Sequence, residues 1–222
     1  MRGEPAISRT DPVVEQYVFA TQDQRARVNG ASMEVDIRAE LPKLKKNGHL
    51  HALRHISRFG RITYDALRFD GDRSVKTDVI ARYLKADVQA SEARDPALAI
   101  TPQNYKFRYK ARLRSSVQNV YIYQLTPRKK RVGLFKGELW IDANTYLPVR
   151  ESGRFVKSPS VFVKNMEFVR EYEILRGVSV PRRIESRADT RLVGRARLII
   201  DFNNYSWGGG AEPIASLEGN GP

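Results

Sequence analysis

Apolar and charged residues alternate along much of this chain, which is the pattern of strands with one buried face. The clearest run is residues 105–114, where aromatic and aliphatic side chains stand between five cations: Lys106, Arg108, Lys110, Arg112 and Arg114. A strand sends successive side chains to opposite faces, whereas a helix would scatter both sets around its circumference. We therefore expect an extended strand here, apolar on one face and cationic on the other.

Two segments carry the spacing of an amphipathic helix instead. Asp11 followed by Pro12 supplies an N-cap and a proline at the first helical position. The apolar stripe behind them predicts a helix over residues 12–27. Between residues 74 and 93, apolar residues recur at every fourth position, which predicts a second amphipathic helix.

The remaining pattern predicts strands separated by turn residues. Three strands precede the second helix, over residues 33–41, 50–59 and 61–69. Seven follow it, over residues 104–115, 117–126, 132–142, 147–156, 160–175, 178–187 and 191–205. We expect residues 1–10 to form a flexible polar lead, residues 11–205 to form one domain, and the glycine-rich residues 206–222 to be a disordered tail.

The order of these elements favours one fold class. Two helices are too few to form an independent bundle, and a long antiparallel meander needs something to cover its apolar face. We therefore predict an α+β fold that is mainly antiparallel β. Its sheet would be a highly curved, unclosed half-barrel of about ten or eleven strands, folded around the two helices.

Composition narrows the class of protein without naming a reaction. The formal net charge is +14 and the sequence pI is near 10.1, which points either to an anionic partner or simply to solubility. There is no cysteine, so disulfides, thiol catalysis and zinc–thiolate sites are excluded. The sequence contains no run of about 20 apolar residues, the length that a membrane-spanning helix needs. Its first residues lack the apolar core of a signal peptide. The sequence is compatible both with a cytoplasmic protein and with the mature part of an exported protein.

The positive charge is concentrated in one stretch. Residues 96–137 contain ten Lys or Arg and no Asp or Glu, including a basic turn of Arg128, Lys129, Lys130 and Arg131. We expect these four residues and the five cations of the strand to contact an anionic surface, such as lipid head groups. Nucleic acid is less favoured, because alternation places the aromatic residues opposite the cations, whereas base stacking beside a charged groove needs both on one face.

Histidines offer little candidate chemistry. The only three are His49, His51 and His55. His49 and His51 would share a strand face and could bind a metal ion, but His55 lies about 13 Å along a strand from His51 at the usual rise, too far to join them. Exposed structural histidines are the favoured interpretation. Ser57, His55 and Asp65 could be placed as a catalytic triad, but no nucleophile-elbow sequence accompanies them.

Three carboxylates share one face of a later strand: Glu167, Glu171 and Glu173. Paired carboxylates can hydrolyse glycosides, but on a charge-rich strand we expect them to pair with nearby arginines such as Arg182 and Arg183. We therefore predict no catalytic residue, no metal site and no cofactor, and a protein that is not an enzyme.

A hairpin in the second half of the chain carries a family resemblance. Residues 137–142 (GELWID) and 145–150 (TYLPVR) are similar to the paired-strand signature of outer-membrane lipoprotein-sorting proteins. The strand at residues 121–127 (YIYQLTP) and the GVSVP step at residues 177–181 are also similar. With its order of helix, three strands, helix and long meander, the chain resembles the LolA/LolB-like superfamily over most of residues 12–205.

The resemblance implies an unclosed barrel whose helices form a lid over an apolar cavity. In that family the cavity accepts lipid or lipoprotein acyl chains, in a protein of the periplasm or cell envelope whose signal peptide has been removed. The candidate cavity residues are large apolar side chains on the predicted strands and the second helix: Tyr83, Leu84, Tyr109, Leu125, Trp140, Met166, Phe168 and Phe202. Two alternatives stay open, a basic nucleic-acid-binding β-protein and an inert envelope interaction or sensor domain of the same fold. Nothing in the sequence indicates the oligomeric state.

Overall fold

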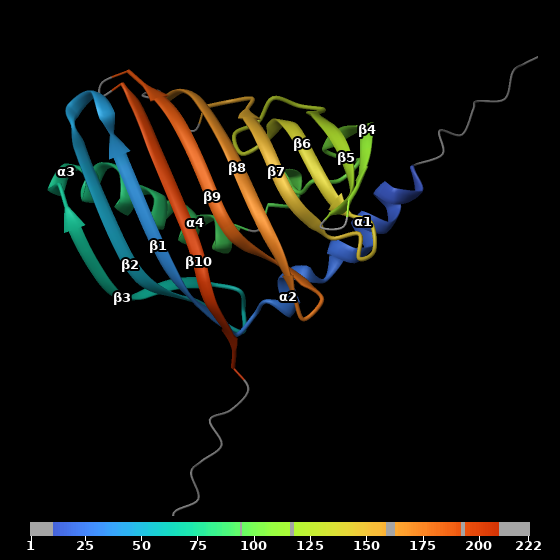
Figure 1. The fold of residues 1–222 in the computed structure, drawn as a ribbon, viewed down its shortest axis with the longest axis horizontal. Coiled ribbons are helices and arrows are strands. Elements are labelled where there is room, and N and C mark those ends of the chain that lie inside the picture. The colour runs from blue at the N-terminus through green and yellow to red at the C-terminus, as the bar shows by residue number, and fades with distance from the viewer. Residues whose placement is uncertain (1–10, 94, 116–117, 159–162, 192–193, 209–222) are drawn as a thin grey trace, which may run out of the picture.

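The fold is built on one antiparallel sheet. A computed structural model describes residues 11–93, 95–115, 118–158, 163–191 and 194–208. The described strands form a single ten-stranded sheet in the order β3-β2-β1-β10-β9-β8-β7-β6-β5-β4. Each strand is antiparallel to its neighbours, and β1, near the start of the chain, pairs with the last strand, β10. Figure 1 shows this sheet curving around helices that lie behind it.

The strands have these bounds: β1 Ala31–Leu41, β2 Lys46–Ile56, β3 Ile62–Gly71, β4 Tyr105–Arg114, β5 Asn119–Pro127, β6 Phe135–Asp142, β7 Pro148–Phe155, β8 Val163–Leu175, β9 Val178–Thr190 and β10 Arg195–Trp207. Strands β3 and β4 are the two edges, so the described sheet is not closed. The predicted fold class, a mainly antiparallel and unclosed half-barrel, is confirmed.

The helices pack against one face of the sheet, which we call the helical face; the opposite side is the outer face. The first helical segment is α1, Pro12–Gln22, followed by the short α2, Gln24–Arg27. The second consists of α3, Arg73–Val75, a π-helical turn, Lys76–Ile80, and α4, Ala81–Ala93. Both predicted helices are therefore present, each with an interruption. In the described part of the chain, no helix has the length and apolar character needed to cross a membrane.

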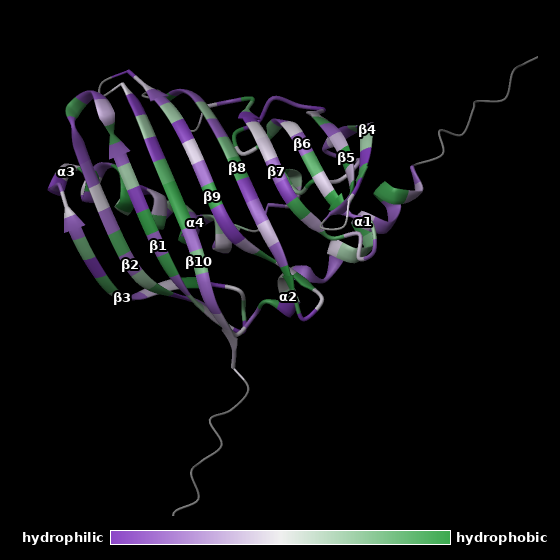
Figure 2. Ribbon diagram, viewed as in Figure 1, coloured by the Kyte–Doolittle hydropathy of each residue, from purple (hydrophilic) through white to green (hydrophobic). Residues whose placement is uncertain are grey.

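Two apolar cores cover the helical face. The α4 core joins inward residues of β1, β2 and β10 with the α3–α4 segment. The α1 core joins inward residues of β4, β5, β6 and β8 with α1. Figure 2 shows the underlying pattern as alternating hydrophobic and hydrophilic bands along the strands. On β1, Val35, Ile37 and Ala39 are each 0% exposed, which confirms the alternation predicted there.

The limits of the domain are described only in part. Strand β10 continues to Trp207, past the predicted end at residue 205. The predicted lead at residues 1–10 and most of the predicted tail at residues 206–222 lie outside the described residues. The assignment of residues 11–205 as one domain therefore stays a prediction.

Candidate functional site

A cavity of about 610 Å³ opens on the helical face, between α2, the C-terminal part of α4 and the strands β1, β2 and β9. Its volume lies within the usual range of ligand sites, roughly 300–1,000 Å³. Apolar side chains supply much of the lining: Ala26, Val28, Ala31, Met33, Ile56, Ile62, Ala90, Val180 and Pro181. The lining also contains polar residues: Gln22, Asp23, Gln24, Asn29, Arg54, Ser91, Tyr172, Ser179 and Tyr205.

Two hydrogen bonds fix the sides of this cavity. The Gln24 side chain of α2 accepts from the Ser179 amide of β9 at 2.7 Å. The Ser91 hydroxyl of α4 accepts from the Ile62 amide of β3 at 3.1 Å. The helices α1 and α4 are each anchored on a separate core.

One polar group holds α4 against the sheet. Arg54 of β2 is 8% exposed, and its Nε donates to Oδ2 of Asp87 on α4 at 3.0 Å. The Tyr64 hydroxyl donates to the same oxygen at 2.7 Å. Burial alone would lower the pKa of Arg54, but the Asp87 carboxylate, together with Tyr64 and Tyr83, raises that pKa overall. Burial raises the pKa of Tyr64, so the site contains a charged pair and a neutral phenol.

A second polar group lies between the two cores. Arg170 of β8 donates from Nη1 to Oε2 of Glu151 on β7 at 3.3 Å, and its guanidinium lies 4.8 Å from the ring centroid of Phe168. Burial acts to lower the pKa of Arg170, yet Tyr172 and Glu151 raise it overall. Burial, followed by the charge of Glu151, raises the pKa of Tyr172. Arg170 therefore stays charged and Tyr172 stays neutral.

The structure places most predicted cavity residues in the cores. Leu125, Phe168 and Phe202 are 0%, 5% and 3% exposed. Tyr83 and Leu84 of α4 are partly buried and pack against the α4 core. None of these five is among the described residues that line the 610 Å³ cavity, so their contact with a ligand stays a prediction.

Tyr109 and Met166 lie nearer to solvent. Tyr109 is 53% exposed, and its ring centroid lies 5.7 Å from that of Tyr123 in the α1 core. Met166 is half-buried at an alternate position to Phe168 on β8. Both lie outside the described lining of the 610 Å³ cavity, and contact of either with a ligand also stays a prediction.

Trp140 lies on the outer face. Its neighbours Leu139 and Ile141 are each 0% exposed in the α1 core, so strand alternation turns Trp140 the other way. It pairs across the sheet with Arg150, whose guanidinium lies 5.0 Å from the Trp140 ring centroid. Its Nε1 donates to Oε2 of Glu138 at 3.2 Å. The prediction that Trp140 lines the cavity is therefore wrong.

Sequence reasoning missed the charged residues of the helical face, although the sequence carries a signal for them. Arg54 follows Leu50 and Ala52 at alternate positions of β2, and these two are 2% and 0% exposed. A cation at an inward position of an apolar face is costly unless it has a partner. Arg170 gives the same signal, at the next inward position after Phe168 on β8.

The cationic strand is interrupted by a bulge. The register of β4 against β5 shifts between Tyr109 and Ala111, and an extra residue reverses the faces of the residues that follow it. Arg112 consequently pairs with Tyr121 and lies 4.7 Å from its ring centroid, beside the α1 core. The prediction that all five cations share one face is therefore wrong for Arg112 and Arg114.

The other three cations of β4 lie before or at the bulge. Lys106 and Arg108 are exposed. Lys110 forms an ion pair with Glu138 of β6 at 2.5 Å. Its hydrogen bond is the main reason why the pKa of Glu138 lies below the ordinary value.

The basic turn after β5 is exposed along its length, from Arg128 through Lys129 and Lys130 to Arg131. Arg128 donates from Nε to the Pro102 carbonyl at 2.8 Å. Arg131 lies 3.5 Å from a carboxylate oxygen of Asp95. The expected contact of this turn and of β4 with an anionic surface stays a prediction.

Two histidines share a carboxylate on the outer face. Oδ1 of Asp36 on β1 lies 3.2 Å from Nε2 of His49 and 3.2 Å from Nδ1 of His51. Sequence reasoning missed Asp36, because strand pairing and not sequence spacing brings it to the histidines. Among the described residues, no group of three or more His, Cys, Asp or Glu is arranged to hold a metal ion.

His55 lies between a serine and an aspartate, but the serine is not the predicted one. Ser32 contacts Nδ1 of His55 at 2.9 Å, and Asp65 lies 3.3 Å from Nε2. Ser57 instead accepts hydrogen bonds from two backbone amides of its own turn. The Asp65 side chain is 69% exposed, and the strands around it are paired in the sheet. This arrangement therefore lacks the dry site and the free amide donors that stabilise an oxyanion.

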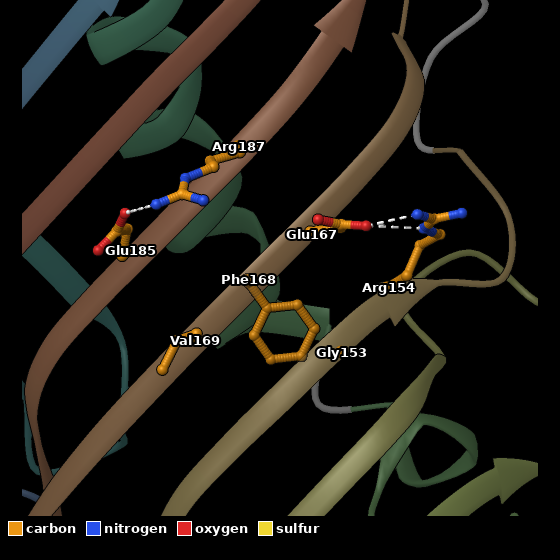
Figure 3. Close-up of a pocket in the computed structure, with 7 residues that line it drawn as sticks. All are labelled: Gly153, Arg154, Glu167, Phe168, Val169, Glu185 and Arg187. Carbon is orange, nitrogen blue, oxygen red and sulfur yellow. Dashed lines mark hydrogen bonds and ion pairs between the residues drawn. The ribbon is translucent and has the colours of Figure 1, made fainter.

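Ion pairs cover much of the outer face. An open groove of about 360 Å³ lies over β7, β8 and β9. Figure 3 shows the residues that line it, including the pairs Arg154–Glu167 and Arg187–Glu185. Glu171 pairs in the same way with Arg182 at 2.8 Å. The expectation that the carboxylates of β8 pair with arginines is confirmed for Glu167 and Glu171.

Comparison with known proteins identifies similar folds. No family model and no curated protein matches this chain. A LolA-superfamily protein from Nitrosomonas europaea matches with 12% identity over 88% of this chain and 93% of that one, at a TM-score of 0.44. A putative outer-membrane lipoprotein-sorting protein domain from Vibrio parahaemolyticus matches with 13% identity over 90% of this chain and 95% of that one, at a TM-score of 0.41.

MucB is a further similar structure. It matches with 10% identity over 87% of this chain and 93% of that one, at a TM-score of 0.34. The similar structures thus include LolA-like proteins, the family that the sequence resembles. This similarity is one of fold. These identities are too low to transfer a function.

Proposed function

We propose that this chain is a non-enzymatic protein of the bacterial cell envelope that holds a lipid, or the acyl chain of a lipoprotein, on its helical face. The observation that supports this most is the cavity of about 610 Å³ lined by Met33, Ile56 and Ile62 among other apolar residues. Each methylene buried there would contribute about 0.8 kcal/mol to binding. Even a short acyl chain would therefore gain measurable affinity.

Lipid extraction and displacement test this proposal. The purified protein, extracted with organic solvent, should release lipid that mass spectrometry detects. It should also bind a fluorescent fatty acid that unlabelled fatty acids displace. Absence of lipid, together with no displacement by any acyl chain, would overturn the proposal.

A variant of α4 links binding to the cavity. Ala90 is exposed and lies in the cavity lining, so Ala90→Trp should fill part of the space. Loss of two or three buried methylenes should lower the affinity by about tenfold or more. Ala81→Trp, at an exposed position outside the lining at the other end of the same helix, is the matched control and should leave the affinity unchanged.

The proposal includes contact with an anionic membrane through the exposed basic turn of residues 128–131. Co-sedimentation should show binding to phosphatidylglycerol vesicles and little to phosphatidylcholine vesicles. Lys129→Gln with Lys130→Gln should weaken vesicle binding by about tenfold or more, at about 1 kcal/mol for each cation near the surface. Lys43→Gln with Lys45→Gln is the matched control: it removes two positive charges elsewhere on the protein and should weaken vesicle binding less. Tighter binding to single-stranded DNA than to these vesicles would favour the nucleic-acid alternative.

We also propose a periplasmic or envelope location. Support comes from the sequence resemblance and from the proposed ligand, because acyl-bearing lipoproteins cross that compartment. Fractionation of cells that express the complete gene, with periplasmic and cytoplasmic markers, tests this. Protein found with the cytoplasmic marker alone would contradict it.

A further inference from the structure

Arg170 occupies a position on β8 where alternation predicts an apolar side chain. It follows Met166 and Phe168 at alternate positions, and its cross-strand neighbours are Glu151 on β7 and Ile184 on β9. Phe168 is 5% exposed, as expected for this face. A charged group among apolar neighbours is destabilising unless it is paired. Glu151 supplies the partner, but the pair is not symmetrical.

The two members of the pair differ in accessibility. The side chain of Arg170 is 38% exposed, whereas that of Glu151 is 8% exposed. Nη1 of Arg170 donates to Glu151, and a guanidinium carries five N–H groups in all. Glu151 and Tyr172 engage part of the guanidinium. Because Arg170 is the more exposed member of the pair, a molecule on the helical face meets its remaining donors rather than the carboxylate of Glu151.

This accessible cation adjoins the cavity. Tyr172 lies at the next inward position after Arg170 on β8 and lines the cavity. Arg54 lines the cavity as well. Tyr83 of α4 is near both arginines, since each of them acts to lower its pKa, although burial raises that pKa overall. Cationic and phenolic groups thus gather at the β8 and α4 side of the cavity. The polar groups at the α1–α2 side are Gln22, Asp23, Gln24 and Asn29.

We propose that the cavity takes a single-chain amphiphile with an anionic head group, a carboxylate or a phosphate. The head group lies at Arg170 and Tyr172, and the chain extends toward Ile56 and Ile62. A planar guanidinium matches two oxygens of such a head group with parallel N–H donors. This inference rests on the proposed function and deepens it by naming the class of ligand.

The two arginines, Arg54 and Arg170, are each paired with a carboxylate, and Asp23 in the cavity lining adds a further negative charge, so net charge does not favour an anionic ligand. The preference for an anion comes instead from which groups are accessible. Phe168 and Glu151 already hold the Arg170 guanidinium in place, so little ordering is required when the head group binds.

Competitors with the same chain and different head groups separate the two parts of the ligand. Palmitate and hexadecanol are titrated against a bound fluorescent fatty acid. Palmitate should displace it at a concentration lower by about tenfold or more, because hydrogen bonds to charged groups are the stronger ones. Hexadecyl phosphate should match or exceed palmitate, and the tighter of the two identifies the head group. Acetate and inorganic phosphate, which lack a chain, should not compete at these concentrations.

A double variant removes both charges without leaving a buried carboxylate unpaired. Arg170→Gln with Glu151→Gln should abolish the preference for palmitate and keep the affinity for hexadecanol. Arg182→Gln is the matched control, because Arg182 forms an exposed ion pair with Glu171; it should keep the preference. Thermal unfolding shows that each variant is folded. Arg170→Lys keeps the charge and loses the planar fork of N–H donors, so it should weaken palmitate binding several-fold and leave hexadecanol binding unchanged. This variant tests the inference even if the double variant does not fold.

The outcomes distinguish this inference from the proposed function. Equal displacement by palmitate and hexadecanol overturns the inference and leaves the proposed function standing. A preference for palmitate that survives in the double variant, or that is as large in Arg170→Lys as in the wild type, also overturns it. If no chain-bearing competitor displaces the probe, the proposed function and the inference fall together.

Discussion

Gly137 on β6 and Gly153 on β7 lie directly opposite each other, at a point where neither strand has room for a side chain. A Cβ atom on Gly137 would lie 1.9 Å from the carbonyl oxygen of Ser152, and one on Gly153 would lie 2.5 Å from that of Lys136. Both contacts are with backbone, which cannot move aside as a flexible side chain would. The glycine that opens the GELWID segment is therefore required by the close approach of two strands.

Gly137→Ala should destabilise the protein by roughly 3 kcal/mol or more, because the added methyl group forces β6 and β7 apart. Urea-induced unfolding followed by circular dichroism measures this change. Gly208→Ala is the control, since its Cβ would lie 3.5 Å from the nearest atom. We expect the control to change the free energy of unfolding by no more than about 0.5 kcal/mol. Equal stability of Gly137→Ala and the wild type would contradict the close approach.

The Arg54–Asp87 pair should contribute more to stability than an exposed pair on the same helix. Arg54→Met should destabilise the protein by about 3 kcal/mol, because it leaves Asp87 without its cation in a mostly buried site. Arg61→Met is the matched control: Arg61 pairs with Glu92 on α4, with side chains 66% and 47% exposed. Arg61→Met should lower the free energy of unfolding by less than about 1 kcal/mol.

A third variant tests whether charge or packing matters at this site. Arg54→Met with Asp87→Leu replaces the pair by apolar side chains and should recover much of the stability lost in Arg54→Met. Chemical denaturation measures all three variants under one condition. An equal loss for Arg54→Met and Arg61→Met would show that Arg54 is not held in a buried pair.

Alternation predicts inward faces correctly where the register is regular, as at Val35 and Ile37 of β1. It fails in β4, because the bulge inserts one residue and the spacing of the cations does not mark which residue is extra. The wrong prediction for Trp140 has a different cause. Alternation alone turns it outward between the buried Leu139 and Ile141, and its choice as a cavity residue gave ring size more weight than position.

The cavity itself could not be predicted from alternation. Its lining joins α2, the turn between β2 and β3, and β9, which are far apart in the sequence. They meet because Gln24 of α2 accepts a hydrogen bond from the Ser179 amide of β9, and no local pattern encodes that contact. What the sequence does contain is Arg54 and Arg170 at inward positions, and both lie in or beside the cavity.

The two tryptophans should report the position of a bound ligand differently. Trp207 stacks on Tyr205 with ring centroids 5.9 Å apart, and Tyr205 lines the cavity. Trp140 lies on the outer face. A brominated fatty acid, which quenches by contact, should therefore quench Trp207 in a Trp140→Phe variant and leave Trp140 nearly unchanged in a Trp207→Phe variant. Stronger quenching of Trp140 would place the ligand on the outer face and contradict the cavity.

Glu138 should make the stability of the protein depend on pH. The hydrogen bond from Lys110 lowers the pKa of Glu138 below its ordinary value of 4.5, against the opposing effect of burial. The folded state then binds fewer protons than the unfolded state near that pH. The resulting stabilisation is complete above the unfolded pKa and is lost as the pH falls through the lower pKa of the folded state.

Glu138→Gln should therefore flatten the acid limb of the stability curve, because glutamine does not titrate. The free energy of unfolding, measured from neutral pH down to about pH 3, should fall less steeply in the variant than in the wild type below the unfolded pKa of the carboxyl. Lys110→Gln should flatten it in the same way, since it removes the partner that lowers the pKa. Lys136→Gln, at an exposed position on the same strand, controls for the loss of one positive charge and should leave the slope unchanged. Parallel curves for the wild type and Glu138→Gln would show that the Lys110–Glu138 contact does not persist in solution.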